Sequence, residues 1–190
     1  MPMFRVPPEF NLGNLPTVAN GSVSGGVRGN VQTIEFMKKI ARERSFYPVI
    51  RQFAKNILIY AGVDSNNYAD EALAIGDYVK NKVRYLRDPD NIEYLQAPED
   101  LIQQMAKGEA QGDCDDMALL IASLLLSIGH QPRFRAVRYK RNTGHYDHIY
   151  VVVYEKNRQG PRMRIALDAI MKQEPIGYEV SHQSGQEYPA

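Results

Sequence analysis

The chain has 190 residues, of which 44% are hydrophobic and 24% are charged, a composition typical of one globular domain with its own core. The 23 Lys and Arg residues nearly balance the 22 Asp and Glu residues, so the net charge of +1 provides no general attraction to nucleic acid or to acidic membranes. The single cysteine excludes an intramolecular disulfide, and the fold must therefore depend on its apolar core.

The first 30 residues differ in composition from the rest of the chain. They contain four of the eleven prolines and five of the fourteen glycines, with few charges. Such a stretch cannot build a core of its own. We therefore expect residues 1–30 to form an extended arm that is ordered by its own domain or by a protein assembly partner.

The N-terminus, MPMFRVPPEF, lacks the continuous apolar run of a secretory signal peptide. The longest apolar stretch, residues 117–128, is too short to span a bilayer. We therefore expect a protein made in the cytoplasm, with neither a membrane nor a nucleic acid as its partner.

Helical periodicity follows the arm. Apolar residues recur every three or four positions over residues 31–44, again after Pro48, and along residues 72–86. A shorter helix should begin at Pro98, a favourable first-turn residue, and end at Gly108.

The next predicted helix has the clearest signal. Asp113 is a good N-cap residue, and Asp115 and Asp116 fall in the first turn, where carboxylates favour the positive end of the helix dipole. Residues 117–128 are apolar on every face, which predicts a central, buried helix that Gly129 ends.

The periodicity then changes to two. Residues 134–139, 149–154 and 163–167 are typical of strands joined by turns. Helices followed by strands predict an α+β fold in which an antiparallel sheet packs on the buried helix. We expect this domain to span residues 31–175, and residues 176–190 to form a polar tail outside the core.

Cys114 falls at the first turn of the predicted buried helix, where the helix dipole lowers the pKa of a thiol. The neighbouring aspartates, Asp113, Asp115 and Asp116, act in the opposite direction, because negative charge disfavours a thiolate. A nearby imidazolium would compensate for them. A histidine close to Cys114 is therefore the feature that would make this cysteine a nucleophile.

Of the four histidines, His148 is the best placed to be that base. His130 follows the far end of the helix and His182 lies in the polar tail, whereas His148 opens an apolar strand. Asp168 closes the next strand and could orient the imidazole. Two simpler interpretations stay open: His148 as an edge residue without a role, and Asp168 as a turn former.

Several segments resemble the transglutaminase-like superfamily. They are residues 96–101 (QAPEDL), 112–120 (GDCDDMALL) and 129–134 (GHQPRF), followed by His148 before an apolar strand and by Asp168 after the next. The resemblance covers roughly residues 65–170. It implies a papain-like fold with a Cys–His–Asp triad at Cys114, His148 and Asp168.

The chain departs from that family in one respect, because it has no tryptophan. The transamidating members use an indole N–H to stabilise the oxyanion. Here the donors would be the backbone N–H of Cys114 and the side-chain amide of Gln96. The missing indole favours hydrolysis over cross-linking.

A metal site is a rival interpretation of the same residues. Cys114, His145 and His148 are zinc-ligand types, but residues three apart on a strand point to opposite faces, so the two histidines cannot chelate together. Some similar proteases hold calcium with the aspartates that flank the cysteine, and Asp113 and Asp115 match those positions. Capping explains both residues more simply, and we expect no cofactor to be required.

The sequence therefore predicts a cysteine hydrolase of the peptidase or amidase type, which acts on a protein or peptide through a thioester at Cys114. An acyltransferase that uses the same thioester is an alternative. Similar small proteins occur among the head and tail genes of bacteriophages, so the resemblance also allows a structural or assembly protein of the virion.

Overall fold

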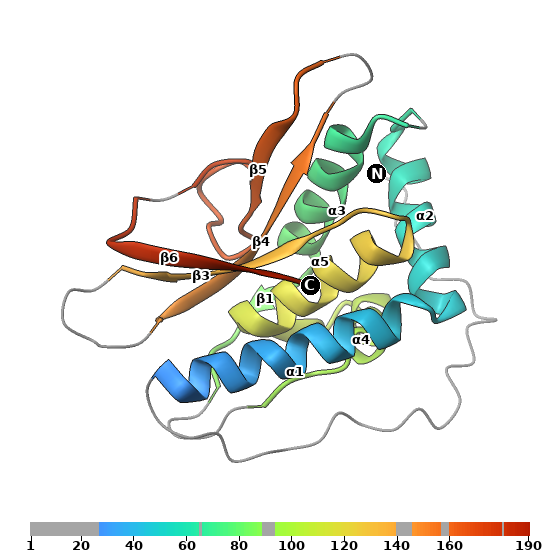
Figure 1. Cartoon of the computed structure of the whole chain (residues 1–190). Coiled ribbons are helices and arrows are strands. Elements are labelled where there is room, and N and C mark those ends of the chain that lie inside the picture. The colour runs from blue at the N-terminus through green and yellow to red at the C-terminus, as the bar shows by residue number, and fades with distance from the viewer. Residues whose placement is uncertain (1–26, 65, 89–93, 140–145, 157–159, 180) are drawn as a thin grey trace.

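The computed structural model describes residues 27–64, 66–88, 94–139, 146–156, 160–179 and 181–190. Five helices surround or form the core, and a four-stranded sheet lies against them (Figure 1). The elements are, in chain order, α1 (Val27–Ser45), α2 (Pro48–Ala61), α3 (Tyr68–Lys82), β1 (Arg84–Tyr85), α4 (Pro98–Lys107), β2 (Gln111–Gly112), α5 (Cys114–Ser127), β3 (Arg133–Arg138), β4 (His148–Glu155), β5 (Met163–Leu167) and β6 (Ser184–Pro189).

Proline and glycine set the bounds of two helices, and for α4 the sequence predicts both bounds. Pro48 and Pro98 occupy the first turns of α2 and α4, where a missing N–H costs nothing. Both helices end at a glycine in the left-handed region, Gly62 at φ 67° and Gly108 at φ 76°.

The predicted buried helix is α5, and it lies at the centre of the molecule. It packs against α1, α2, α3 and α4 and against strand β4, between α1 and the sheet in Figure 1. Leu119, Leu120 and Ile121 are fully buried on consecutive faces of the helix. This burial explains why its sequence is apolar on every side.

The sheet is antiparallel, with strand order β5-β4-β3-β6. Ile149, Val151 and Val153 of β4 join the helical core, whereas Tyr150 and Val152 belong to a small cluster on the opposite face. The predicted alternation and the α+β fold are therefore confirmed. His148 shares the face of Tyr150, which is the face opposite α5.

The helix predicted over residues 72–86 ends earlier, because the chain pairs with another segment. α3 stops at Lys82, Val83 is extended, and β1 then forms a short parallel pair with β2. This pairing places Tyr85 opposite Gly112, two residues before Cys114, and leaves Leu86 beyond the helix and 49% exposed.

The predicted polar tail is wrong in one respect, because residues 184–189 form the edge strand β6. This strand pairs with β3 along its whole length. Its sequence, SGQEYP, has no apolar alternation, and Tyr188 is the residue of this strand that packs against the core. The domain therefore extends to the C-terminal residues.

α1 begins at Val27, inside the predicted arm. Residues 1–26 lie outside the described residues, so the arm and its assembly partner stay predictions. In the part of the chain that is described, no helix is both long and apolar enough to cross a membrane.

Replacing Leu120 by alanine should test whether α5 is the centre of the core. Leu120 is fully buried, so Leu120→Ala should lower the free energy of unfolding by about 2–5 kcal/mol. Urea unfolding followed by circular dichroism measures it. Leu126→Ala, at a half-buried position of the same helix, should cost clearly less, and an equal cost at both positions would contradict the central placement.

Candidate functional site

A cleft of about 520 Å³ lies at the N-terminal end of α5. Cys114 and His148 both line it, together with residues of α1, including Thr33 and Met37, and Tyr85 of β1. A larger hollow of about 880 Å³ lies at the opposite end of α5, and none of the predicted triad residues lines it. The chemistry that the sequence predicts therefore belongs to the smaller cleft.

The start of α5 is fixed by a capping box. The Asp113 side chain accepts the backbone N–H groups of Asp115 and Asp116, and the Asp116 carboxylate accepts the N–H of Asp113 in return. A Cβ atom at Gly112 would lie 2.8 Å from Oδ2 of Asp116, so only glycine fits there. The predicted cap at Asp113 is confirmed, and it holds Cys114 as the first residue of the helix.

Gln96 supports this box from the side. Its backbone N–H donates to Oδ1 of Asp116 at 2.7 Å, and its side-chain amide donates to Oδ2 of Asp116 at 2.8 Å and to the carbonyl of Gln111 at 2.9 Å. Burial raises the pKa of Asp116 to about 6, although the bonds from Gln96 favour its ionised form. Both N–H donors of the Gln96 amide are thus engaged, and the predicted contact with an oxyanion would require one of these bonds to break.

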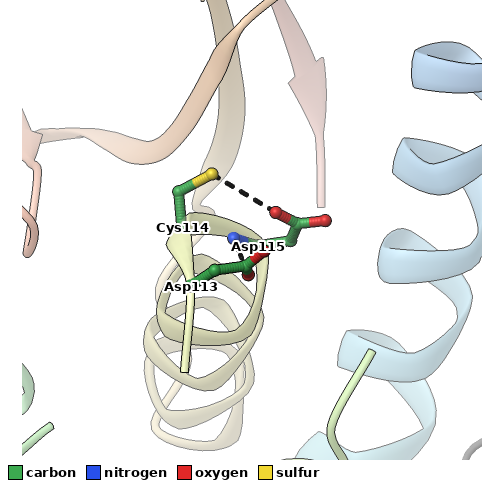
Figure 2. A group of neighbouring side chains, drawn as sticks. All are labelled: Asp113, Cys114 and Asp115. Carbon is green, nitrogen blue, oxygen red and sulfur yellow. Dashed lines mark hydrogen bonds between the residues drawn. The ribbon is translucent and has the colours of Figure 1, made fainter. Parts of the chain in front are cut away.

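The Cys114 thiol lies in an environment that favours its neutral form. It donates a hydrogen bond to Oδ1 of Asp115 at 3.3 Å (Figure 2) and accepts the backbone N–H of Ile149 at the start of β4. Burial raises the pKa of the thiol well above its usual value, and the charges of Asp115 and Asp113 raise it further.

His148 and Asp168 form a buried pair. Nε2 of His148 lies 2.8 Å from Oδ2 of Asp168, and each residue is 5% exposed. The other carboxylate oxygen of Asp168 accepts the N–H of Ile170 at 3.2 Å. This pairing uses Nε2 and leaves Nδ1 as the ring nitrogen that is available to a proton from the cleft.

The structure therefore brings the three predicted residues together, but joins only two of them directly. Cys114 meets the backbone of Ile149 in the first residues of β4, whereas the His148 ring stacks on Tyr150, whose side chain lies on the face opposite α5. Within the described residues no hydrogen bond connects Cys114 with His148, since the thiol bonds to Asp115 and the backbone of Ile149.

Two tyrosine rings stack on His148, and sequence reasoning did not predict this stacking. The rings of Tyr139 and Tyr150 stack on the imidazole, with centroids 5.6 and 5.5 Å away and interplanar angles of 22° and 28°. Tyr150 follows His148 by two residues on β4, and the strand period of two predicts that both side chains share one face, as they do. Tyr139 comes from the neighbouring strand segment and has no such local signal.

Tyr85 is a third unpredicted member of the cleft. Its side chain lines the cleft beside Cys114, and its phenol pKa is raised by partial burial and by the nearby Cys114 and Asp113. A protonated phenol is a hydrogen-bond donor. Tyr85 therefore adds a donor where the Gln96 amide has none free.

The other histidines lie away from the cleft or outside the described residues. His130 is buried between Glu71 and Glu155, at 2.9 and 3.2 Å, and this cluster fastens α3 to β4. His182 contacts Arg135. His145 lies outside the described residues.

Asp113, Cys114 and Asp115 form the one cluster of metal-ligand type within the described residues, with their ligand atoms within 4.8 Å of one another. The Asp113 carboxylate already accepts two backbone N–H groups as a cap. Calcium takes six to eight oxygen ligands, and two carboxylates supply only part of that number. Calcium at Asp113 and Asp115 stays a prediction, and capping accounts for Asp113.

Asp115→Asn should make Cys114 more reactive. The change removes the charge and the carboxylate acceptor that raise the thiol pKa, so more thiolate should form at neutral pH. We expect alkylation by iodoacetamide to accelerate at least about threefold, measured by mass spectrometry. Asp77→Asn, at an exposed position of α3, is the matched control, and an unchanged or lower rate in Asp115→Asn would contradict the electrostatic account.

Comparison with known proteins agrees with the sequence motifs. The model of the transglutaminase-like superfamily matches residues 52–159, more than half of the chain. No curated protein matches the sequence.

Two solved structures are similar in part. One is a provisionally assigned protease of Parabacteroides distasonis, with 12% identity over 70% of this chain and 29% of that one, at a TM-score of 0.47. The other is a provisionally assigned cysteine protease of Cytophaga hutchinsonii, with 17% identity over 76% of this chain and 52% of that one, at a TM-score of 0.44. The chain thus spans about half or less of either protein. By the match of the family model, the chain belongs to the transglutaminase-like superfamily.

Proposed function

We propose that this protein is a cysteine hydrolase of the peptidase or amidase type, with Cys114 as nucleophile, His148 as base and Asp168 as the residue that orients the base. The observation that supports it best is that Cys114 and the His148–Asp168 pair meet at one cleft. The family of the chain is consistent with this chemistry.

The first step requires the thiol to turn from Asp115 to His148. Nδ1 of His148 then accepts the thiol proton, while Nε2–H donates to Asp168 and stabilises the imidazolium. The thiolate attacks the carbonyl carbon of an amide and forms a tetrahedral intermediate. When this intermediate collapses, the C–N bond breaks and the imidazolium protonates the leaving amine.

Water completes the cycle by attacking the resulting thioester. His148 takes a proton from the water as the C–O bond forms, and returns it to the Cys114 sulfur as the C–S bond breaks. The products are a carboxylic acid and the free thiol. If an amine attacks instead, the same thioester yields a new amide, so acyl transfer differs only in the acceptor.

Two groups are placed to donate hydrogen bonds to the oxyanion of each intermediate. The backbone N–H of Cys114 belongs to the first turn of α5, so no acceptor within the helix uses it. The Tyr85 hydroxyl lies in the same cleft. These donors replace the indole that the chain lacks.

Substitution of the three triad residues tests the proposal. Cys114→Ala should abolish hydrolysis of p-nitrophenyl acetate and of labelled casein while circular dichroism stays unchanged, because little volume is lost. His148→Ala and Asp168→Asn should each slow alkylation of Cys114 by iodoacetamide at neutral pH by about tenfold or more. Wild-type rates in His148→Ala would exclude it as the base.

Tyr85→Phe tests the oxyanion donor separately. The hydroxyl should matter for attack on a carbonyl but not for alkylation, in which no oxyanion forms. We expect release of p-nitrophenolate from p-nitrophenyl acetate to slow about tenfold or more, while the iodoacetamide rate changes less than about twofold. If Tyr85→Phe slows both reactions equally, Tyr85 acts on the ionisation of the Cys114 thiol and not on the oxyanion.

A further inference from the structure

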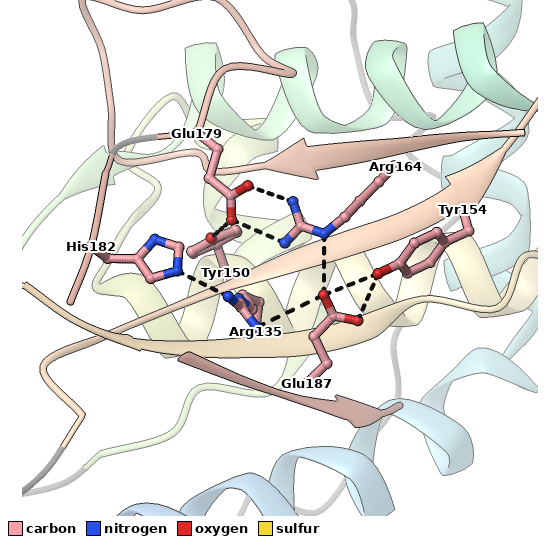
Figure 3. Close-up of polar contacts among 7 residues, drawn as sticks. All are labelled: Arg135, Tyr150, Tyr154, Arg164, Glu179, His182 and Glu187. Carbon is pink, nitrogen blue, oxygen red and sulfur yellow. Dashed lines mark hydrogen bonds and ion pairs between the residues drawn. The ribbon is translucent and has the colours of Figure 1, made fainter. Parts of the chain in front are cut away.

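The face of the sheet opposite α5 carries a polar network that adjoins the His148 ring (Figure 3). Its side chains come from all four strands of the sheet and from the segment between β5 and β6. Its members are Arg135, Tyr150, Tyr154, Arg164, Glu179, His182 and Glu187.

One branch of this network ends on the ring that stacks on His148. The Tyr150 hydroxyl donates to Oε1 of Glu179. Arg164 of β5 donates two hydrogen bonds to the same carboxylate. Its Nη2 lies 2.9 Å from Oε1, and its Nη1 binds Oε2. Glu179 lies outside the strands, so its carboxylate is held in place by Arg164. The carboxylate in turn holds the Tyr150 hydroxyl.

A second branch runs parallel to the first and does not reach His148. Tyr154, on the same strand and face as Tyr150, donates to Glu187 at 3.1 and 3.2 Å. Nε of Arg164 also donates to Glu187, at 3.1 Å. The chain thus provides two similar tyrosine–glutamate–arginine branches, of which only one adjoins the imidazole.

The His148 ring depends on its neighbours for its orientation. Its one protein hydrogen bond in the described residues is that to Asp168, about which the ring can still rotate. The stacked rings of Tyr139 and Tyr150 restrict this rotation. Within the described residues the Tyr139 hydroxyl has no hydrogen-bond partner, so Tyr150 is the ring that a bond holds in place.

We propose that Arg164, Glu179 and Tyr150 are positioning residues, which hold the His148 ring in the plane from which Nδ1 can take the proton of Cys114. This inference rests on the proposed function, since it assigns a supporting role to residues behind its base. Burial and Glu179 raise the pKa of Tyr150, so its hydroxyl stays protonated and remains a donor.

A purely structural role is the competing interpretation, because the same bonds fasten the segment after β5 to the sheet. Tyr150→Phe and Tyr154→Phe distinguish the two. Each variant keeps an aromatic ring and loses one hydroxyl that binds a glutamate. Because Tyr150 is 2% exposed and Tyr154 is 37% exposed, Tyr150→Phe should lower the free energy of unfolding more, and the rates are compared at a temperature at which both variants are folded. Only Tyr150→Phe frees the ring that stacks on His148.

The test combines the alkylation rate of Cys114 by iodoacetamide at fixed neutral pH with the ¹⁵N resonances of the His148 ring. Tyr150→Phe should slow alkylation about tenfold and shift or broaden the His148 resonances, which His148→Ala identifies by their loss. Tyr154→Phe should stay within about twofold of the wild type with unchanged resonances. Equal behaviour of the two variants would overturn the inference.

Glu179→Gln and Glu187→Gln provide the same comparison if Tyr150→Phe does not fold. Glutamine keeps the shape of the side chain but weakens its hydrogen bonds with Arg164. Because only Glu179 binds Tyr150, only Glu179→Gln should slow alkylation. Equal rates in these two variants would also overturn the inference. His148→Ala separates the two levels: if it alkylates as the wild type does, the proposed function fails, whereas slow alkylation in His148→Ala with a normal rate in Tyr150→Phe refutes only the positioning role.

Discussion

The cluster of three carboxyl groups at the start of α5 is the constraint around which the site is built. Asp113, Asp115 and Asp116 share one helical turn with Cys114, and burial raises the pKa of Asp113 and Asp116. The structure compensates with backbone N–H donors, the helix dipole and Gln96. These bonds fix the helix start rigidly, and this rigidity places the sulfur against the first residues of β4.

The same carboxyl groups oppose the chemistry that we propose for the cysteine. The Asp115 carboxylate accepts a hydrogen bond from the thiol, and its negative charge disfavours the thiolate. In this arrangement the thiol is bound to Asp115, and the His148–Asp168 hydrogen bond is formed without any contact with the thiol. In the proposed function, activation would require the thiol to leave Asp115 and its proton to reach the His148 ring, which already binds Asp168. Such a thiol would resist alkylation and oxidation until a substrate or a neighbouring group displaces Asp115.

Local sequence signals predicted the parts of the site that depend on local structure. The cap at Asp113, the buried helix after it and the alternation that follows His148 all arise from residues close together in the chain, and each is confirmed. The engagement of Gln96 with Asp116, the place of Tyr85 and the strand β6 could not be found in this way. The amide of Gln96 is engaged by a carboxylate twenty residues away, Tyr85 reaches the cleft through a two-residue strand pair, and the polar strand β6 is defined only by its pairing with β3.

The cleft combines the part of the chain that matches the family model with parts that lie outside it. Residues 52–159 contain Cys114, His148 and both stacked tyrosines. Asp168 follows this region, as do Arg164 and Glu179, whereas the wall formed by Thr33 and Met37 precedes it. The matched region thus supplies the proposed nucleophile and base, whereas the flanking elements supply the carboxylate that binds the proposed base and one side of the cleft. If the proposed function holds, a substrate bound beside Cys114 would lie next to α1, and the N-terminal helix would then contribute to the choice of acyl group.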